Sequence, residues 1–404
     1  MNPSHKISPF KSHIDDFHTD LNGKAGRTTQ EIKALVGDKP IHKLSSNENV
    51  LGPSPKALAA IQQVLPHLHE YGYRIDTPLR EALAAHFDHE IGADQFITGN
   101  SGLEILDMAA RAFLEPGTES ILSNPTFHVY EMFSEINGAR VVDVPLREGS
   151  FDLDVAGILN AVNARTRLIF IANPNNPTGV MIPKSTLDEI VYKVPEHVII
   201  IHDEVYWHFA DLATFPFAKG YIREGKQVIG LHSFSKAYGL AGLRVGYGFS
   251  TPRIAAYLQK LRRPFFINTL SMEGALAALG DEEHLRRTQA LIATEKAWLY
   301  GLFDQLGIVY WPSHTNFILF RAPGETAAFV EQLLQQGILV RSGDNNGAPG
   351  CIRLTIGTHE ANQAFVDALS RYRSKWPMSM PSVSSFVLPK TRTLRVAAGM
   401  KSAE

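Results

Sequence analysis

Between about Thr98 and Gly248 the sequence alternates short apolar runs, rich in β-branched residues, with segments long enough to form helices. This alternation is typical of βαβ units, in which a helix returns the chain to the start of the next parallel strand. We expect strands at residues 120–123, 140–145, 167–172, 197–202, 227–233 and 245–249, and helices at 103–114, 126–136 and 185–194. The sequence therefore predicts a large α/β domain around a mostly parallel sheet. Ligands of such sheets bind beyond the carboxyl ends of the strands, so functional side chains are expected there.

The pattern changes after Pro264 and indicates a smaller α+β domain. It begins with a long helical stretch and continues with short strands between helices. The expected elements are helices at 270–306, 327–336 and up to about 373, and strands at 315–320, 338–341 and 352–356. The predicted organisation is an N-terminal arm at 1–42, a small domain at 43–85 and 265–374, a large domain at 86–264, and a flexible tail at 375–404.

The composition favours a small-molecule ligand over nucleic acid or a membrane. Hydrophobic residues make up 44% of the chain, charged residues make up 20%, and the formal net charge is −2, which is ordinary for a soluble globular protein. No basic field is available for nucleic acid, and no apolar run reaches the length of a membrane span. The only cysteine, Cys351, excludes an intrachain disulfide and a cysteine metal cluster, and we expect it to be a small buried residue. We expect a cytoplasmic protein without a metal site.

Two polar clusters follow predicted strands in the first half of the sheet. The segment 173–179, Asn-Pro-Asn-Asn-Pro-Thr-Gly, is by turn chemistry a tight loop, but Asn176 could direct its amide at a ligand oxygen. The segment 202–206, His-Asp-Glu-Val-Tyr, ends a very apolar strand, and its carboxylates could cap a helix or bind a metal. Asp203 and Tyr206 stand three positions apart, so on a helical first turn they share a face.

Two further clusters suit a phosphate group. Ser233-Phe234-Ser235-Lys236 ends a third strand, and Arg244 follows in a glycine-rich segment, so hydroxyl donors and a guanidinium converge. A dinucleotide-binding loop is the rival interpretation, but the glycines do not have the G-x-G-x-x-G spacing. Ser101 and Gly102 open a predicted helix whose free N–H groups favour an anion, although taken alone they form a helix cap.

The ordered set of these residues resembles the fold-type I pyridoxal-5'-phosphate (PLP) aminotransferases of class I/II, and within them the histidinol-phosphate aminotransferase branch. The resemblance runs from about Lys43 to Arg373. It rests on the clusters described above and on further segments at residues 46–49, 51–55, 71, 79–81, 315–317, 341 and 351–357. It implies a sheet of the seven-stranded type and a homodimer with shared active sites.

The resemblance also implies roles around the cofactor ring. Lys236 would hold PLP as a Schiff base and move the proton between the substrate Cα and the cofactor. Asp203 would pair with the pyridinium nitrogen, and Asn176 and Tyr206 would bond the phenolic oxygen. Phe127 would stack on the ring, although a core phenylalanine at a helix start is the alternative.

For the phosphate and the substrate, the resemblance implies basic and hydroxyl side chains. The implied phosphate ligands are Ser233, Ser235 and Arg244 with Ser101 and Gly102. Tyr71 would reach this phosphate from the neighbouring subunit. Arg353 would fix the acidic group of the substrate, with Arg341 as a second arginine nearby and Asn176 beside it; outside the resemblance, Arg341 is a solvated charge at a strand end.

Three features depart from the family pattern. Leu103 stands before Glu104 where the family carries an acidic residue, and residues 22–27 lack the tyrosine and Pro-Gly pattern of the branch. The loop at 342–350, with two asparagines and three glycines, is free to form a different substrate gate.

We therefore expect a PLP-dependent aminotransferase that moves an amino group from histidinol phosphate to 2-oxoglutarate through pyridoxamine phosphate. One alternative is an aromatic or other amino-acid aminotransferase, with Phe127, Trp207 and Phe266 lining an apolar pocket. Another is a PLP-dependent amino-acid phosphate decarboxylase. A non-enzymatic regulator would have lost Lys236 or Asp203, or gained a DNA-binding segment, and the sequence shows neither change.

Overall fold

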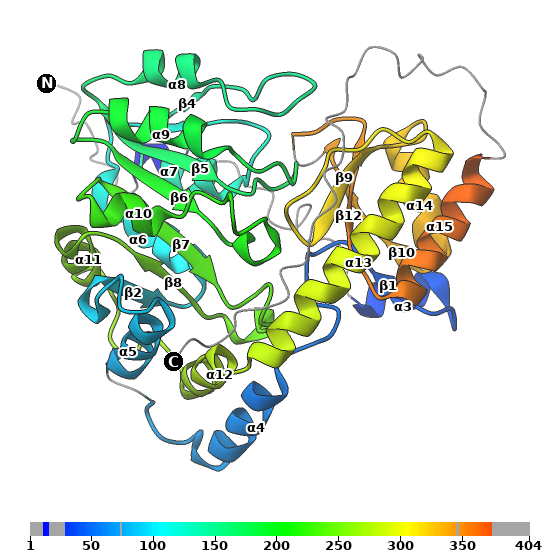
Figure 1. The fold of residues 1–404 in the computed structure, drawn as a ribbon, viewed down its shortest axis with the longest axis horizontal. Coiled ribbons are helices and arrows are strands. Elements are labelled where there is room, and N and C mark those ends of the chain that lie inside the picture. The colour runs from blue at the N-terminus through cyan, green and yellow to red at the C-terminus, as the bar shows by residue number, and fades with distance from the viewer. Residues whose placement is uncertain (1–10, 16–28, 73–74, 345–346, 374–404) are drawn as a thin grey trace, which may run out of the picture.

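The computed structural model describes residues 11–15, 29–72, 75–344 and 347–373. The predicted tail at 375–404 and much of the predicted arm lie outside these residues. Figure 1 shows a large sheet with its helices on one side of the molecule, a smaller group of strands and helices on the other, and α13 (Glu282–Leu306) running obliquely between them. Among the described residues, no helix has both the length and the apolar character that a membrane span requires.

A seven-stranded sheet forms the centre of the large part. Its strands, in spatial order, are β2 (Phe96–Gly99), β8 (Gly246–Phe249), β7 (Val228–Ser233), β6 (Ile199–Asp203), β5 (Thr166–Ala172), β3 (Glu119–Leu122) and β4 (Arg140–Asp143). The five strands from β7 to β4 are parallel, and β8 runs antiparallel to both of its neighbours. The prediction of a mostly parallel sheet is confirmed, and all six expected strands are present with ends within two residues of expectation.

The central strands are apolar on both faces because helices cover both faces. Along β5, Ile169 and Ile171 belong to one core cluster, while Leu168 and Phe170 belong to another. The second cluster lies under α6 (Gly102–Phe113), α7 (Val129–Ile136) and α11 (Pro252–Gln259). The first lies under α8 (Val155–Ala161), α9 (Lys184–Lys193) and α10 (Ala218–Arg223).

The smaller part is built on a three-stranded antiparallel sheet. Its strands, in spatial order, are β11 (Arg341–Ser342), β12 (Cys351–Thr355) and β9 (Phe317–Arg321), and a two-stranded parallel pair joins β1 (His42–Lys43) to β10 (Ile338–Leu339). The helices are α3 (Thr29–Val36), α13, α14 (Thr326–Gln335) and α15 (His359–Arg373). The expected strand 338–341 is thus two strands in different sheets. Cys351 is buried in β12, as expected.

Three helices of the predicted small domain join the core of the large sheet instead: α5 (Thr77–His86) packs on β2, α12 (Thr269–Leu279) packs on α5, and α4 (Pro55–Val64) packs on α12. Side chains of all three helices belong to the core cluster of that sheet. Figure 1 shows them below the sheet, away from the small strands. The domain boundaries stay a prediction, but these contacts favour grouping the three helices with the large part.

The long helical stretch expected at 270–306 is divided in two. Gly280 ends α12, and Asp281 caps α13 because its side chain accepts a hydrogen bond from the amide of His284. The remaining short helical elements are α1 (Ser12–Asp15), η1 (Leu65–His67), η2 (Ala93–Gln95), η3 (Trp207–Phe209) and η4 (Ala241–Leu243).

Candidate active site

The carboxyl ends of β5, β6 and β7 bring three of the predicted clusters to one edge of the sheet. Ala172 is in register with Asp203, so the segments after β5 and β6 start at the same level. Asp203 is in register with Leu231, and β7 continues past this level to Ser233. The backbone of Asn173 donates to the carbonyl of Asp203 at 2.8 Å, which fixes the first residue of the 173–179 loop beside β6.

Asp203 is a buried carboxylate held by two donors. The hydroxyl of Tyr130, on α7, donates to Oδ2 at 2.6 Å, and the backbone N–H of Val205 donates to Oδ1 at 3.1 Å. Burial raises the pKa of Asp203, which its hydrogen bonds oppose. No arginine or lysine of the described residues lies within ion-pair distance of it, so a cationic ligand atom would relieve its desolvation.

Tyr130 is a site residue that the sequence prediction missed. Its ring is fully buried and stacks on Phe170 of β5, with centroids 4.9 Å apart and an angle of 13°. The predicted ring partner Phe127 stands three positions earlier and packs edge-on against Tyr130 at 5.7 Å. The place of Tyr130 in the sequence does not by itself indicate its contact with Asp203, which only the fold brings about.

Lys236 and Tyr206 meet at a short segment from the other part of the chain. The amine of Lys236 lies 5.6 Å from the centroid of the Tyr206 ring and 3.5 Å from the carbonyl oxygen of Ser46. The hydroxyl of Tyr206 accepts a hydrogen bond from Nδ2 of Asn47 at 3.0 Å. The part of the site around Lys236 and Tyr206 is therefore built both from segments that follow strands of the large sheet and from residues 45–47.

Arg353 and Asn176 are in direct contact. On β12, Arg353 donates from one terminal nitrogen to Oδ1 of Asn176 and from the other to the carbonyl of Ser45, both at 2.7 Å. Its Nε is buried without a partner among the described residues. Burial lowers the pKa of Arg353 to about 10, so it stays charged at neutral pH. Arg341 stands opposite it in the antiparallel register of β11 and β12, and burial lowers the pKa of Arg341 as well.

The predicted phosphate residues surround the end of β8. Ser233 is in register with Gly246, and a Cβ at Gly246 would lie 2.5 Å from the backbone nitrogen of Gly102. The N-terminus of α6, capped by Ser101, therefore meets the end of β7 across a position that requires glycine. Ser235 is buried beside Ser233, to whose hydroxyl its own amide donates.

Arg244 lies in the segment that joins β7 to β8, directly after η4. It adopts a left-handed φ of 57° and, in this structure, donates to the carbonyl of Ala241 at 2.9 Å with its side chain exposed. A phosphate bound at the N-terminus of α6 would compete with that carbonyl for the guanidinium.

Three predicted residues lie outside this cluster. Tyr71 is 85% exposed, and its ring lies 4.8 Å from that of Phe265. The expected place of Trp207 and Phe266 in an apolar substrate pocket is not supported. The ring of Trp207 packs against His208, Phe217 and His232. Phe266 packs against the core of the large sheet and lies under the guanidinium of Arg262.

A buried network next to Asp203 was also missed by the sequence prediction. Glu204 is fully buried between His202, 3.0 Å from its Oε1, and His232, 2.7 Å from its Oε2. The second ring nitrogen of His232 lies 2.9 Å from the hydroxyl of Tyr247. The two imidazoles outweigh the effect of burial and lower the pKa of Glu204 to about 2. Asp203 and Glu204 point to opposite faces of the sheet end, as adjacent strand residues do.

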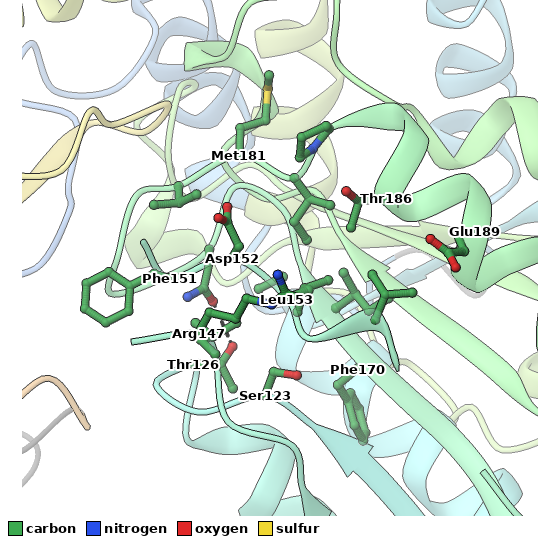
Figure 2. Close-up of a pocket in the computed structure, with 18 of the residues that line it drawn as sticks. Ser123, Thr126, Arg147, Phe151, Asp152, Leu153, Phe170, Met181, Thr186 and Glu189 are labelled. Carbon is green, nitrogen blue, oxygen red and sulfur yellow. Dashed lines mark hydrogen bonds between the residues drawn. The ribbon is translucent and has the colours of Figure 1, made fainter. Parts of the chain in front are cut away.

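A pocket of about 430 Å³ lies beside the site and outside the predicted cofactor residues. Figure 2 shows it between the segment after β4, which carries Arg147 and Asp152, and the start of α9, which carries Thr186. Thr126 and Asn175 line it and bond each other at 2.9 Å, so this pocket adjoins the site through the neighbours of Phe127 and Asn176.

The observed side chains suit PLP. Asp203, which has no arginine or lysine partner among the described residues, could bind the protonated ring nitrogen of PLP. The amine of Lys236 could bond to its aldehyde carbon, and the N-terminus of α6 beside Ser233 could bind its phosphate. The fold and this site define a PLP-dependent aminotransferase. Residues 39–369 match the family described as Aminotransferase class I and II. The chain belongs to this family.

Curated relatives and solved structures agree with this assignment. The chain is 39% identical over 345 residues to the histidinol-phosphate aminotransferase of Moorella thermoacetica, covering 85% of this chain and 88% of that protein. It is 40% identical over 348 residues to histidinol-phosphate aminotransferase 2 of Pseudomonas fluorescens strain Pf0-1, covering 86% and 93%. The crystal structure of histidinol-phosphate aminotransferase from Sinorhizobium meliloti, in complex with PLP, matches with a TM-score of 0.81 at 26% identity, covering 92% and 99%.

Proposed function

We propose that this enzyme transfers the amino group of histidinol phosphate to 2-oxoglutarate. The observation that carries the choice of donor is the pair of arginines on neighbouring strands, Arg353 and Arg341, in register and next to Asn176. Two guanidinium groups suit a doubly charged phosphate and serve equally for a dicarboxylate acceptor. The names of the curated relatives support the same donor.

In this proposal PLP, when bound, withdraws electrons from the substrate Cα and so makes its proton acidic. Lys236 supplies the amine that holds the cofactor and then carries the proton to and from the Cα. Asp203 keeps the ring nitrogen protonated, while Tyr206 and Asn176 bind the phenolic oxygen. Ser233, Ser235, Arg244 and the N-terminus of α6 hold the phosphate.

The proposal includes a homodimer and a cytoplasmic location. The exposed ring of Tyr71 lies beside that of Phe265, and exposed apolar side chains occur along α4, η1 and the segments before α5 and α12. These side chains are Leu58, Leu65, Leu68, Ile75 and Phe265. An exposed apolar surface of this kind is typical of a subunit interface, and Tyr71 on it would reach the phosphate of the partner.

The anchoring lysine is tested by covalent trapping. Borohydride treatment of the wild type is expected to fix PLP on the peptide that contains Lys236, and Lys236→Ala is expected to abolish that adduct. Mass spectrometry of the digested protein measures both. An adduct retained in Lys236→Ala would contradict the assignment of this residue.

The donor is tested by a panel of amines. We expect histidinol phosphate to convert the bound cofactor to pyridoxamine phosphate faster, at equal concentration, than phenylalanine, tyrosine or threonine phosphate, as followed by absorbance. 2-Oxoglutarate should then restore the starting spectrum. A response to phenylalanine or tyrosine alone would favour the aromatic alternative, and release of carbon dioxide from threonine phosphate would favour the decarboxylase.

A further inference from the structure

Asn47 contacts a proposed catalytic side chain although it belongs to the segment before α4. It is 2% exposed and adopts a left-handed φ of 54°, which asparagine tolerates better than most residues. Its backbone N–H donates to Oγ1 of Thr355 at 2.9 Å, and its carbonyl accepts from Nδ2 of Asn316 at 3.1 Å. The backbone of Asn47 is therefore fixed to the smaller sheet independently of its side chain.

The hydrogen bonds of the side chain determine which way its amide faces. The hydroxyl of Thr355 donates to Oδ1 of Asn47 at 3.1 Å, and Nδ2 of Asn47 donates to the hydroxyl of Tyr206 at 3.0 Å. In the flipped orientation the buried hydrogen of Thr355 would lose this acceptor, and an amide nitrogen would point at its oxygen instead. The network therefore presents the NH₂ group, and not the carbonyl, to Tyr206.

This orientation leaves the phenolic hydrogen of Tyr206 for a ligand. The Tyr206 oxygen accepts from Asn47, and within the described part of the chain no acceptor lies within hydrogen-bond distance of its own hydrogen. A phenol that accepts one hydrogen bond also becomes a stronger donor of another, because the two bonds polarise each other.

We propose that Asn47 is a positioning residue that makes the hydroxyl of Tyr206 a donor toward the phenolic oxygen of the cofactor. The inference rests on the proposed function, in which Tyr206 binds that oxygen. A hydrogen bond donated to this oxygen stabilises its negative charge and so lowers the proton affinity of the nitrogen that joins Lys236 to the cofactor. Asn47 thereby lowers the pH at which that nitrogen loses its proton.

The test is a pH titration of the absorbance of the bound cofactor, without substrate. Asn47→Gly removes the amide while keeping a residue that accepts a positive φ, and we expect it to raise the titration midpoint by about half a pH unit. Asn47→Asp retains the shape but offers only acceptors, and we expect a rise of about one unit. In a Tyr206→Phe background, Asn47→Gly should add no shift, since its effect passes through the missing hydroxyl.

Asn49→Ala is the matched control. Asn49 belongs to the same segment, but its amide donates to the carbonyl of Ala237 and to Thr288, so its loss loosens the segment without touching Tyr206. An unchanged midpoint in Asn47→Gly, an equal shift in Asn49→Ala, or a full shift in the Tyr206→Phe background would each overturn the inference. A wild type whose cofactor shows no link to Lys236 would instead contradict the proposed function.

Discussion

Two adjacent carboxylates at the end of β6 occupy opposite electrostatic environments. Asp203 has neutral donors and a raised pKa, whereas Glu204 lies between two imidazoles and has a pKa of about 2. Within the described residues Glu204 therefore has two imidazole partners of its own, whereas Asp203 has no arginine or lysine partner, and in the proposed function the cofactor ring nitrogen would supply a cation. Two neighbouring residues thus belong to different parts of the molecule, Glu204 to a buried network with two imidazoles and Asp203 to the proposed cofactor site.

The network predicts a pH-dependent loss of stability in Glu204→Gln. The pKa of Glu204 lies below its ordinary value of 4.5, so its contribution to the free energy of unfolding is complete above about pH 4.5 and disappears toward pH 2. We expect the variant to lose about 3 kcal/mol at neutral pH, because a buried partner is removed. Urea unfolding at about pH 7 and about pH 3.5 should show the gap to wild type shrinking on acidification.

Glu189→Gln is the control for this measurement, since Glu189 makes an exposed ion pair with Lys193 at 2.8 Å. Its loss should change the free energy of unfolding by less than about 0.5 kcal/mol at either pH. A gap that stayed constant between the two pH values would contradict the ionised state of Glu204.

Tyr130→Phe should reduce turnover without unfolding the protein. The variant keeps the ring stacked on Phe170 and loses only the hydroxyl that donates to Asp203. A hydrogen bond to a charged group is worth about 1.5–3 kcal/mol, so we expect kcat to fall about tenfold. Steady-state kinetics measure this, with Tyr192→Phe as a control, whose exposed hydroxyl bonds Glu224. Wild-type kcat in Tyr130→Phe would exclude a functional bond to Asp203.

The sequence pointed to candidate site residues that follow strands, but not to those that lie on helices or in distant segments. Asp203 and Lys236 stand where an apolar run ends, which is a local pattern. Tyr130 is one aromatic residue in an amphipathic helix, and only the fold brings its hydroxyl to β6. Asn47 lies far from Tyr206 in the chain, and no local spacing predicts their contact.

At the scale of elements, glycines on β7 and β8 allow α6 to lie close to the sheet. Gly246 of β8 lies against the first turn of α6, Gly248 of β8 leaves room for Ile105, and Gly230 of the neighbouring β7 leaves room for Phe249. Small residues in these two strands therefore permit the N-terminus of α6 to reach the end of β7. The proposed phosphate site depends on this approach.

Gly246→Ala is expected to lower the affinity for PLP at least about tenfold, since the new methyl group would meet backbone atoms of Ser101 and Gly102 and shift the helix start. Fluorescence titration of the apoenzyme with PLP measures the affinity. Gly242→Ala is the control, because in the described part of the chain its Cβ would meet no atom within 4 Å. Equal affinities in the two variants would refute the close-approach argument.

The sequence did not predict β2 or the break between α12 and α13. Four residues of an edge strand, Phe96–Gly99, carry too little periodicity to be distinguished from a loop. The break at Gly280 and Asp281 did have a signal, a glycine followed by an acidic cap, but the apolar residues on both sides masked it.

At the scale of the whole molecule, the proposed dimer makes each active site a joint product of two chains. Tyr71→Ala and Lys236→Ala are each expected to be inactive as homodimers. If Tyr71 serves the partner, mixing after unfolding and refolding gives hybrid dimers with one intact site, and activity should return to about a quarter of wild type. No recovery on mixing would place Tyr71 in the site of its own subunit.

In the structure without substrate, the guanidinium of Arg353 is already held by other parts of the chain. Both terminal nitrogens of the guanidinium are engaged, by Asn176 and by the carbonyl of Ser45, and only Nε lacks a partner. The guanidinium carries five N–H donors and these two acceptors take only two of them, so an incoming anion can bind the others, Nε–H included, without displacing either contact. If Arg353 binds the substrate, as proposed, the two contacts hold its guanidinium in place beforehand, so binding an anion costs little of the freedom of this long side chain.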